Sequence, residues 1–241
     1  MNDKGFKVVI WVDDVLCRGS PEETDTFHKK LQEKFECRSE SMQILTPNNP
    51  LDYVALNLTM EVEQSGAVRY SMDQTEGMLA FLVKVGLDKE KARSTPMSSI
   101  DLLLSDDTPF GEEEAKWVKA CLGALHHFVR STRWDIAAAV SFMSQFNATP
   151  TVGAKLALQY LGGYLVENPD LKISAIRADS PDVFSHFTDS GFYTMKYSQT
   201  GVMVLLNGAP IHWKSRKQAD VADSPAVAEI YALKAGVKDS R

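Results

Sequence analysis

The stretch from Val8 to Cys17 constrains the fold of this chain more than any other. Two apolar runs, residues 8–12 and 15–17, flank the adjacent carboxylates Asp13 and Asp14. The runs are rich in β-branched residues, as buried strands are. Asp is a common turn residue, so the pattern predicts a β-hairpin with an Asp-Asp turn at its tip.

The two carboxylates at this tip have two interpretations. In the simpler one, Asp13 and Asp14 are only turn residues. In the other they hold Mg²⁺, a hard cation that prefers oxygen ligands. Two-metal phosphoryl transfer needs carboxylates that bridge or flank ions about 4 Å apart. A hairpin pair supplies only part of such a set, and the residues before Val8 are too few to supply the further Asp strand.

Composition narrows the class of protein. Hydrophobic residues make up 44% and charged residues 24% of the 241 residues, which is typical of a globular rather than a disordered chain. The net charge of -6 argues against a strongly basic nucleic-acid binder. It does not exclude a nucleic-acid enzyme, because the basic surface of such an enzyme can be local. Without a long apolar run or a signal-peptide pattern, we expect an intracellular protein of the cytoplasm or nucleus with no membrane partner. The widely spaced Cys17, Cys37 and Cys121 indicate reduced thiols.

The C-terminal third carries a second acidic pair. Residues 183–191 are strand-like and contain Asp189, residues 201–206 predict a buried strand, Asn207-Gly208 is a hairpin turn, and residues 210–214 return. A helix then begins at Ser224-Pro225. Its expected apolar stripe is Ala226, Ile230, Leu233 and Val237, with Glu229 beside it. Asp189 and Glu229 could bind Mg²⁺ together, or could be an ordinary strand residue and a solvent-facing helical residue.

The middle of the chain predicts further strand and helical segments joined by loops. Residues 51–60 predict one continuous strand, and residues 94–111 predict a linker. Apolar spacing predicts helices around residues 27–35, 75–85, 112–129, 136–143 and 156–164. Short connections between the last three indicate an antiparallel bundle. The five histidines show no metal-ligand spacing.

One alternative is a receiver-like signalling module. Residues 7–14 are similar to the first strand and acidic pair of a response-regulator receiver, and residues 52–60 are similar to its phosphoacceptor strand. The acceptor position would be Asn57, whose amide cannot form an acyl phosphate. A receiver would also leave residues 112–241 unexplained.

An ordered series of motifs along nearly the whole chain resembles the reverse transcriptase/RNase H of copia-type LTR retrotransposons, a part of their Pol polyprotein. Residues 11–14 (WVDD) resemble the polymerase motif Tyr-Val-Asp-Asp, and residues 95–97 (TPM) resemble part of the Ser-Thr-Pro-Met linker. Residues 132–136 (TRWDI) resemble Thr-Arg-Pro-Asp-Ile. The strongest matches are residues 198–201 (SQTG), 206–218 (LNGAPIHWKSRKQ) and 228–233 (AEIYAL), which resemble the RNase H domain.

The resemblance implies an α+β fold in three parts. Residues 1–100 would be the C-terminal part of the reverse-transcriptase palm and thumb, including the palm hairpin. Residues 101–178 would be a helical connection region, and residues 179–241 the N-terminal half of an RNase H-like domain. Asp13 and Asp14 would be catalytic metal ligands of the polymerase, and Asp189 and Glu229 those of RNase H, all binding Mg²⁺.

In the complete protein the resemblance implies an RNA-directed DNA polymerase, a nucleotidyltransferase that uses an RNA template, a DNA primer and deoxynucleotides. It also implies a ribonuclease H that acts on an RNA/DNA hybrid. This chain departs from the family pattern because the remaining Asp ligands of both sites are missing, Trp134 replaces a Pro, and Ala55 replaces a Gly at a close turn. We therefore expect the isolated chain to be inactive, either as a fragment of an active polyprotein or as a relic of a transposable element.

Overall fold

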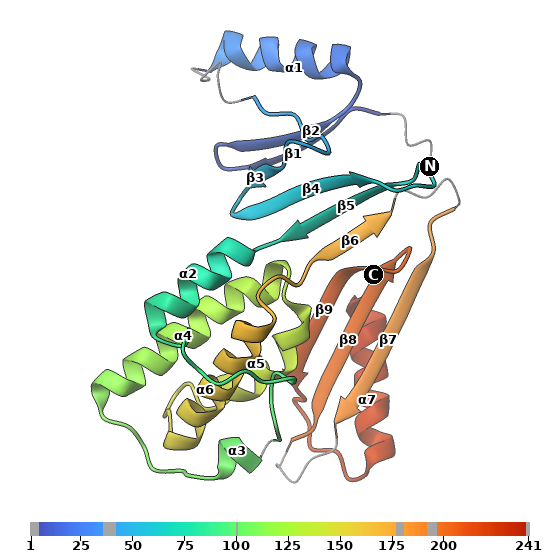
Figure 1. Cartoon of the computed structure of the whole chain (residues 1–241). Coiled ribbons are helices and arrows are strands. Elements are labelled where there is room, and N and C mark those ends of the chain that lie inside the picture. Colours follow the sequence, from blue (N-terminus) through green and yellow to red (C-terminus); the bar gives the residue numbers. More distant parts are fainter. Residues whose placement is uncertain (1–4, 36–41, 100, 177–180, 192–196, 240–241) are drawn as a thin grey trace.

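The computed structural model describes residues 5–35, 42–99, 101–176, 181–191 and 197–239. Within these residues the chain is mixed α/β, with three separate sheets whose strand pairs are all antiparallel (Figure 1). The strands are β1 Lys7–Trp11, β2 Asp14–Arg18, β3 Leu51–Tyr53, β4 Leu56–Val62, β5 Val68–Asp73, β6 Ile173–Ile176, β7 Phe184–Gly191, β8 Gln199–Leu206 and β9 Ala209–Lys217. The helices are α1 Pro21–Lys34, α2 Thr75–Val85, α3 Asp101–Leu104, α4 Glu112–Ser131, the 3-10 helix η2 Trp134–Ile136, α5 Ala137–Ser144, α6 Val152–Glu167 and α7 Pro225–Asp239.

The N-terminal hairpin is confirmed, but its turn differs from the predicted one. β1 and β2 pair from Lys7–Arg18 to Trp11–Asp14, so the turn residues are Val12 and Asp13, and Asp14 already belongs to β2. Val12 has a φ of 56°, a left-handed conformation that is unusual for a β-branched side chain. The antiparallel register decides the turn, because it pairs Asp14 opposite Trp11.

The predicted strand over residues 51–60 is wrong in one respect: a tight turn divides it into β3 and β4. Val54 and Ala55 have φ values of 54° and 59°, so both lie in the left-handed region. This is the position at which a glycine is the usual residue of the resembled family, and a glycine adopts such a φ at little cost. Strand β6 was not predicted from the sequence, and it completes this sheet by pairing with β5 across a sequence separation of about a hundred residues.

Helices α2, α4, α5 and α6 share one hydrophobic core. Its fully buried members include Met78, Leu82, Val118, Leu125, Ile136, Val140, Leu158, Leu161 and Leu165. The chain after α2 also lies close against α6: a Cβ on Gly163 would lie 2.0 Å from the backbone oxygen of Lys91, so this contact requires glycine. The predicted linker over residues 94–111 contains the short helix α3.

The C-terminal unit is a β7-β8-β9 meander with α7 on one face, as the sequence predicted (Figure 1). The face that α7 turns toward the sheet is not the predicted one. Its buried residues are Ala228, Ala232, Ala235 and Gly236, whereas Ile230, Leu233 and Val237 are 61%, 57% and 50% exposed. The small residues face the sheet because α7 packs closely: a Cβ on Gly236 would lie 2.2 Å from a methyl carbon of Thr188.

Two polar contacts join the other face of this sheet to the helices. Trp213 on β9 donates its indole N–H to the backbone oxygen of Val129 at 2.6 Å. Gln199 on β8 donates to the Ser141 hydroxyl on α5 at 2.7 Å.

The first two of the three predicted parts, residues 1–100 and 101–178, share structure. Helix α2 of the first part contributes to the hydrophobic core of the second, and strand β6 of the second part pairs with β5 of the first. The three-part division remains a prediction from the resemblance.

The arrangement does not fit the receiver alternative. A receiver is built on a parallel sheet with regular β/α alternation, whereas the strand pairs described here are antiparallel. Asp13 and Asp14 also lie in the β1–β2 hairpin, which is separate from the sheet that contains Asn57, and the side chain of Asn57 donates to Asp73. In the described residues, none of the helices combines the length and apolar character needed to cross a bilayer.

Candidate functional site

The hairpin tip presents its carboxylates to solvent. Asp13 and Asp14 are exposed, and the flanking Trp11 and Val12 are 61% and 87% exposed. The sequence-predicted pair lies at this tip: Asp13 is a turn residue next to Val12, and Asp14 is the first residue of β2. The tip supplies two neighbouring exposed carboxylates, but no third acidic residue joins them within the described part of the chain.

Asp189 and Glu229 are placed on different sides of the C-terminal sheet. Thr188 faces α7, because it meets Gly236 there. Side chains alternate along a strand, so the next residue, Asp189, points to the face away from α7. Glu229 lies on α7 itself, and both carboxylates are exposed. The described structure therefore does not bring the two predicted ligands together.

The fit of these residues to Mg²⁺ follows from their positions. Among the described residues, no three His, Cys, Asp or Glu side chains form a group that could hold a metal ion. The hairpin pair and the Asp189–Glu229 pair each lack partners, so the described side chains do not build a complete magnesium site by themselves.

A buried ionic network occupies the junction between α4 and η2, where the sequence showed a motif but not its role. Arg133 donates through Nε and Nη2 to the two carboxylate oxygens of Asp135, at 2.9 and 2.8 Å. Tyr164 on α6 donates its hydroxyl to the same carboxylate at 2.9 Å. Burial, with the Asp135 charge, raises the pKa of Tyr164 to about 12. This network ties η2 to α6 and is structural, because it lies inside the molecule.

A second buried polar cluster fixes the C-terminal sheet to its helices. Gln218 donates to the Thr200 hydroxyl at 3.1 Å and to the backbone oxygen of Ala228 on α7 at 2.9 Å. Gln199 joins the sheet to α5 on the opposite face. Both glutamines belong to the motifs that resemble RNase H. The sequence marked them only by resemblance, and the tertiary structure shows which groups they join.

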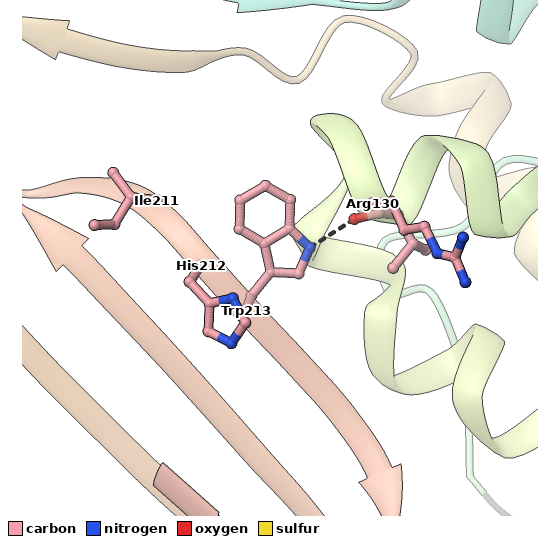
Figure 2. A pocket seen from close by; sticks show the side chains of 5 residues that line it. Arg130, Ile211, His212 and Trp213 are labelled. Carbon is pink, nitrogen blue, oxygen red and sulfur yellow. Dashed lines mark hydrogen bonds between the residues drawn. The ribbon is translucent and has the colours of Figure 1, made fainter. Parts of the chain in front are cut away.

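One hollow lies between α4 and β9. It encloses about 260 Å³ and is lined by Val129, Arg130, Ile211, His212 and Trp213. In Figure 2 the indole of Trp213 reaches toward α4, while the Arg130 side chain extends away from it. His212 also approaches Asp239 on α7, with 3.8 Å between nitrogen and oxygen. The hollow has a mixed polar and apolar lining and lies where β9 packs against α4.

Cys121 is a buried thiol on α4. Burial raises the pKa of the Cys121 thiol to about 11, so it is protonated and unreactive at neutral pH. Cys17 lies on β2 and is partly exposed. Cys37 lies outside the described residues.

Comparison with known proteins relates the chain to retrotransposon proteins over nearly its whole length. It is 23% identical over 239 residues to the putative transposon Ty5-1 protein YCL074W of Saccharomyces cerevisiae, covering 95% of this chain and 72% of that protein. It is 24% identical over 238 residues to the retrovirus-related Pol polyprotein from transposon RE1 of Arabidopsis thaliana, covering 94% of this chain and 15% of the polyprotein. These matches support a protein derived from a retrotransposon Pol polyprotein.

A further relative covers half of the chain. Over 123 residues the chain is 29% identical to the secreted RxLR effector protein 161 of Plasmopara viticola, covering 50% of this chain and 87% of that protein. No protein-family model matches the chain, and no solved structure matches it.

Proposed function

We propose that this chain is a segment of a copia-type Pol polyprotein that spans the junction between reverse transcriptase and RNase H. In the complete polyprotein the two units are an RNA-directed DNA polymerase and a ribonuclease of RNA/DNA hybrids, both dependent on Mg²⁺. Asp13 and Asp14 are the polymerase carboxylates in this proposal, and Asp189 and Glu229 belong to RNase H. The isolated chain catalyses neither reaction.

The single observation that carries the proposal is the collinear match to retrotransposon proteins over more than nine-tenths of the chain. Two structural features agree with it. The first acidic motif lies at the tip of a hairpin, and the last motifs lie on a three-stranded meander followed by a helix. Fold likeness alone would not indicate a chemistry, so the argument rests on the motif order and on these acidic positions.

The expected inactivity of the isolated chain follows from the placement of its carboxylates. Two-metal catalysis needs several oxygen ligands around ions about 4 Å apart. Asp13 and Asp14 lack a third carboxylate in the described structure, and Asp189 and Glu229 are on different sides of the sheet. In this proposal other segments of the polyprotein supply the remaining ligands, and the C-terminal unit rearranges so that Asp189 and Glu229 meet.

The test is a paired assay. The 241-residue chain and the complete reading frame that contains it are compared in Mg²⁺-dependent primer extension and in hybrid cleavage. We expect activity only from the complete frame, with extension abolished by Asp13→Asn and cleavage abolished by Glu229→Gln. Extension by the isolated chain, lost on Asp13→Asn, would contradict the inactivity. A complete frame that is inactive although folded would favour the relic interpretation.

A further inference from the structure

The outer face of α7 has the pattern of a helix-pairing surface. Ala226, Ile230, Leu233 and Val237 follow one another at spacings of four, three and four residues, which places them on one stripe. The stripe lies opposite the small residues that pack on the sheet. Ile230 and Leu233 are 61% and 57% exposed, although they are the largest aliphatic side chains of this helix.

The residue types select one kind of pairing. In heptad notation Ile230 and Val237 occupy a positions and Leu233 a d position. Among parallel coiled coils, β-branched residues at a with leucine at d favour two strands over three or four. Glu229 then falls at g and Lys234 at e, and both are exposed.

The charges agree with the same orientation. In a parallel pair, residue g of one helix lies beside residue e five positions further along the other helix. Glu229 of one copy would lie beside Lys234 of the other, and the two-fold axis would repeat this pair. An antiparallel pair brings g beside g and e beside e, so it does not form the Glu229–Lys234 pair.

We infer that this stripe is a homodimer interface in which α7 of two copies pack in parallel about a two-fold axis. The contact is isologous, so the same residues serve both copies. It goes beyond the proposed function and does not depend on it. Few apolar side chains contribute, so each partner should bury less than the roughly 800 Å² that is typical of a standard interface. The dimer should therefore be weak, with a Kd of about 10–100 μM.

The test is sedimentation equilibrium of the full 241-residue chain from about 1 to 300 μM, in buffer of about 0.05 M ionic strength. We expect the mass to rise from 26.8 kDa toward twice that value. Leu233→Asp should abolish the dimer, because it places two carboxylates face to face at the seam. Leu79→Asp, at an exposed leucine of α2, is the matched control and should leave dimerisation unchanged.

Charge variants test the orientation. Lys234→Glu or Glu229→Lys turns two attractive pairs into two repulsive ones and should weaken the dimer by about tenfold. The combined exchange Glu229→Lys/Lys234→Glu should restore it to within about threefold of the natural chain. Lys238→Glu, the same charge change off the seam, is the control.

Three outcomes would overturn the inference. They are a monomer at every concentration, a dimer that survives Leu233→Asp, and a combined exchange that fails to recover dimerisation. Circular dichroism of each variant verifies that it is folded.

Discussion

The buried pair Arg133–Asp135 gives the sharpest prediction about stability. The side chains of Arg133 and Asp135 are 2% and 9% exposed, and the Nη1 of Arg133 finds no hydrogen-bond partner among the described residues. Asp135→Asn keeps the shape of the side chain and removes its charge. The guanidinium is then left buried without a counter-ion, which costs about 3 kcal/mol, the lower end of the range for breaking a buried pair.

The measurement is thermal and urea unfolding of the folded 241-residue chain. For a chain of this size, 1 kcal/mol corresponds to about 2–4 °C, so we expect Tm to fall by roughly 6–12 °C. Glu112→Gln is the matched control, because Glu112 makes the same kind of pair with Lys116 while both side chains are largely exposed. That change should cost less than about 0.5 kcal/mol.

A double variant separates the charge effect from a simple loss of packing. Arg133→Met/Asp135→Asn removes both charges and leaves an amide oxygen that can accept from Tyr164. It should be more stable than Asp135→Asn alone, because no uncompensated charge remains inside. The reasoning is refuted if Asp135→Asn costs no more than Glu112→Gln, or if the double variant is as unstable as the sum of its single changes.

Two further predictions concern backbone strain and pH. Ala55→Gly should raise the free energy of unfolding by about 1 kcal/mol, because the exposed Ala55 holds a φ of 59° that glycine adopts freely. The same change at the exposed, helical Ala138 should lower the free energy of unfolding by about 1 kcal/mol. Chemical denaturation of both variants checks the contrast. The raised pKa of Tyr164 means that the unfolded chain loses this proton at lower pH than the folded chain, so its contribution is complete below about pH 10 and is lost as pH rises toward about 12. Tyr164→Phe should therefore show a smaller loss of stability over that interval than the natural chain, and equal slopes in urea titrations from pH 9 to 12 would contradict this.

The C-terminal unit shows how far a pattern can be followed. The strands, the Asn207-Gly208 turn and the start of α7 were predicted correctly, because turn residues and apolar runs act locally. The buried face of α7 was predicted wrongly. Periodicity identifies a stripe of large aliphatic residues, but close packing on a sheet can select small residues instead, as the contact of Gly236 with Thr188 shows.

The candidate sites divide in the same way. The sequence alone identified Asp13 and Asp14 as neighbours, since adjacency in a hairpin needs no tertiary information. It could not decide whether Asp189 and Glu229 meet, because that depends on the strand face that Asp189 occupies and on where α7 lies. The helix lies against Thr188, and alternation along β7 turns Asp189 the other way.

By itself the sequence determined the hairpin, most of the helices, the C-terminal meander and the relation to retrotransposon Pol proteins, because these follow from local periodicity, turn chemistry and motif order. Only the tertiary structure decided the pairing of β6 with β5, the burial of the Arg133–Asp135–Tyr164 network and the outward stripe of α7. Each of these joins residues far apart in the chain or selects between two faces of one element. Local propensity carries no information on either choice, because the free energy that decides it comes from burying one surface against another.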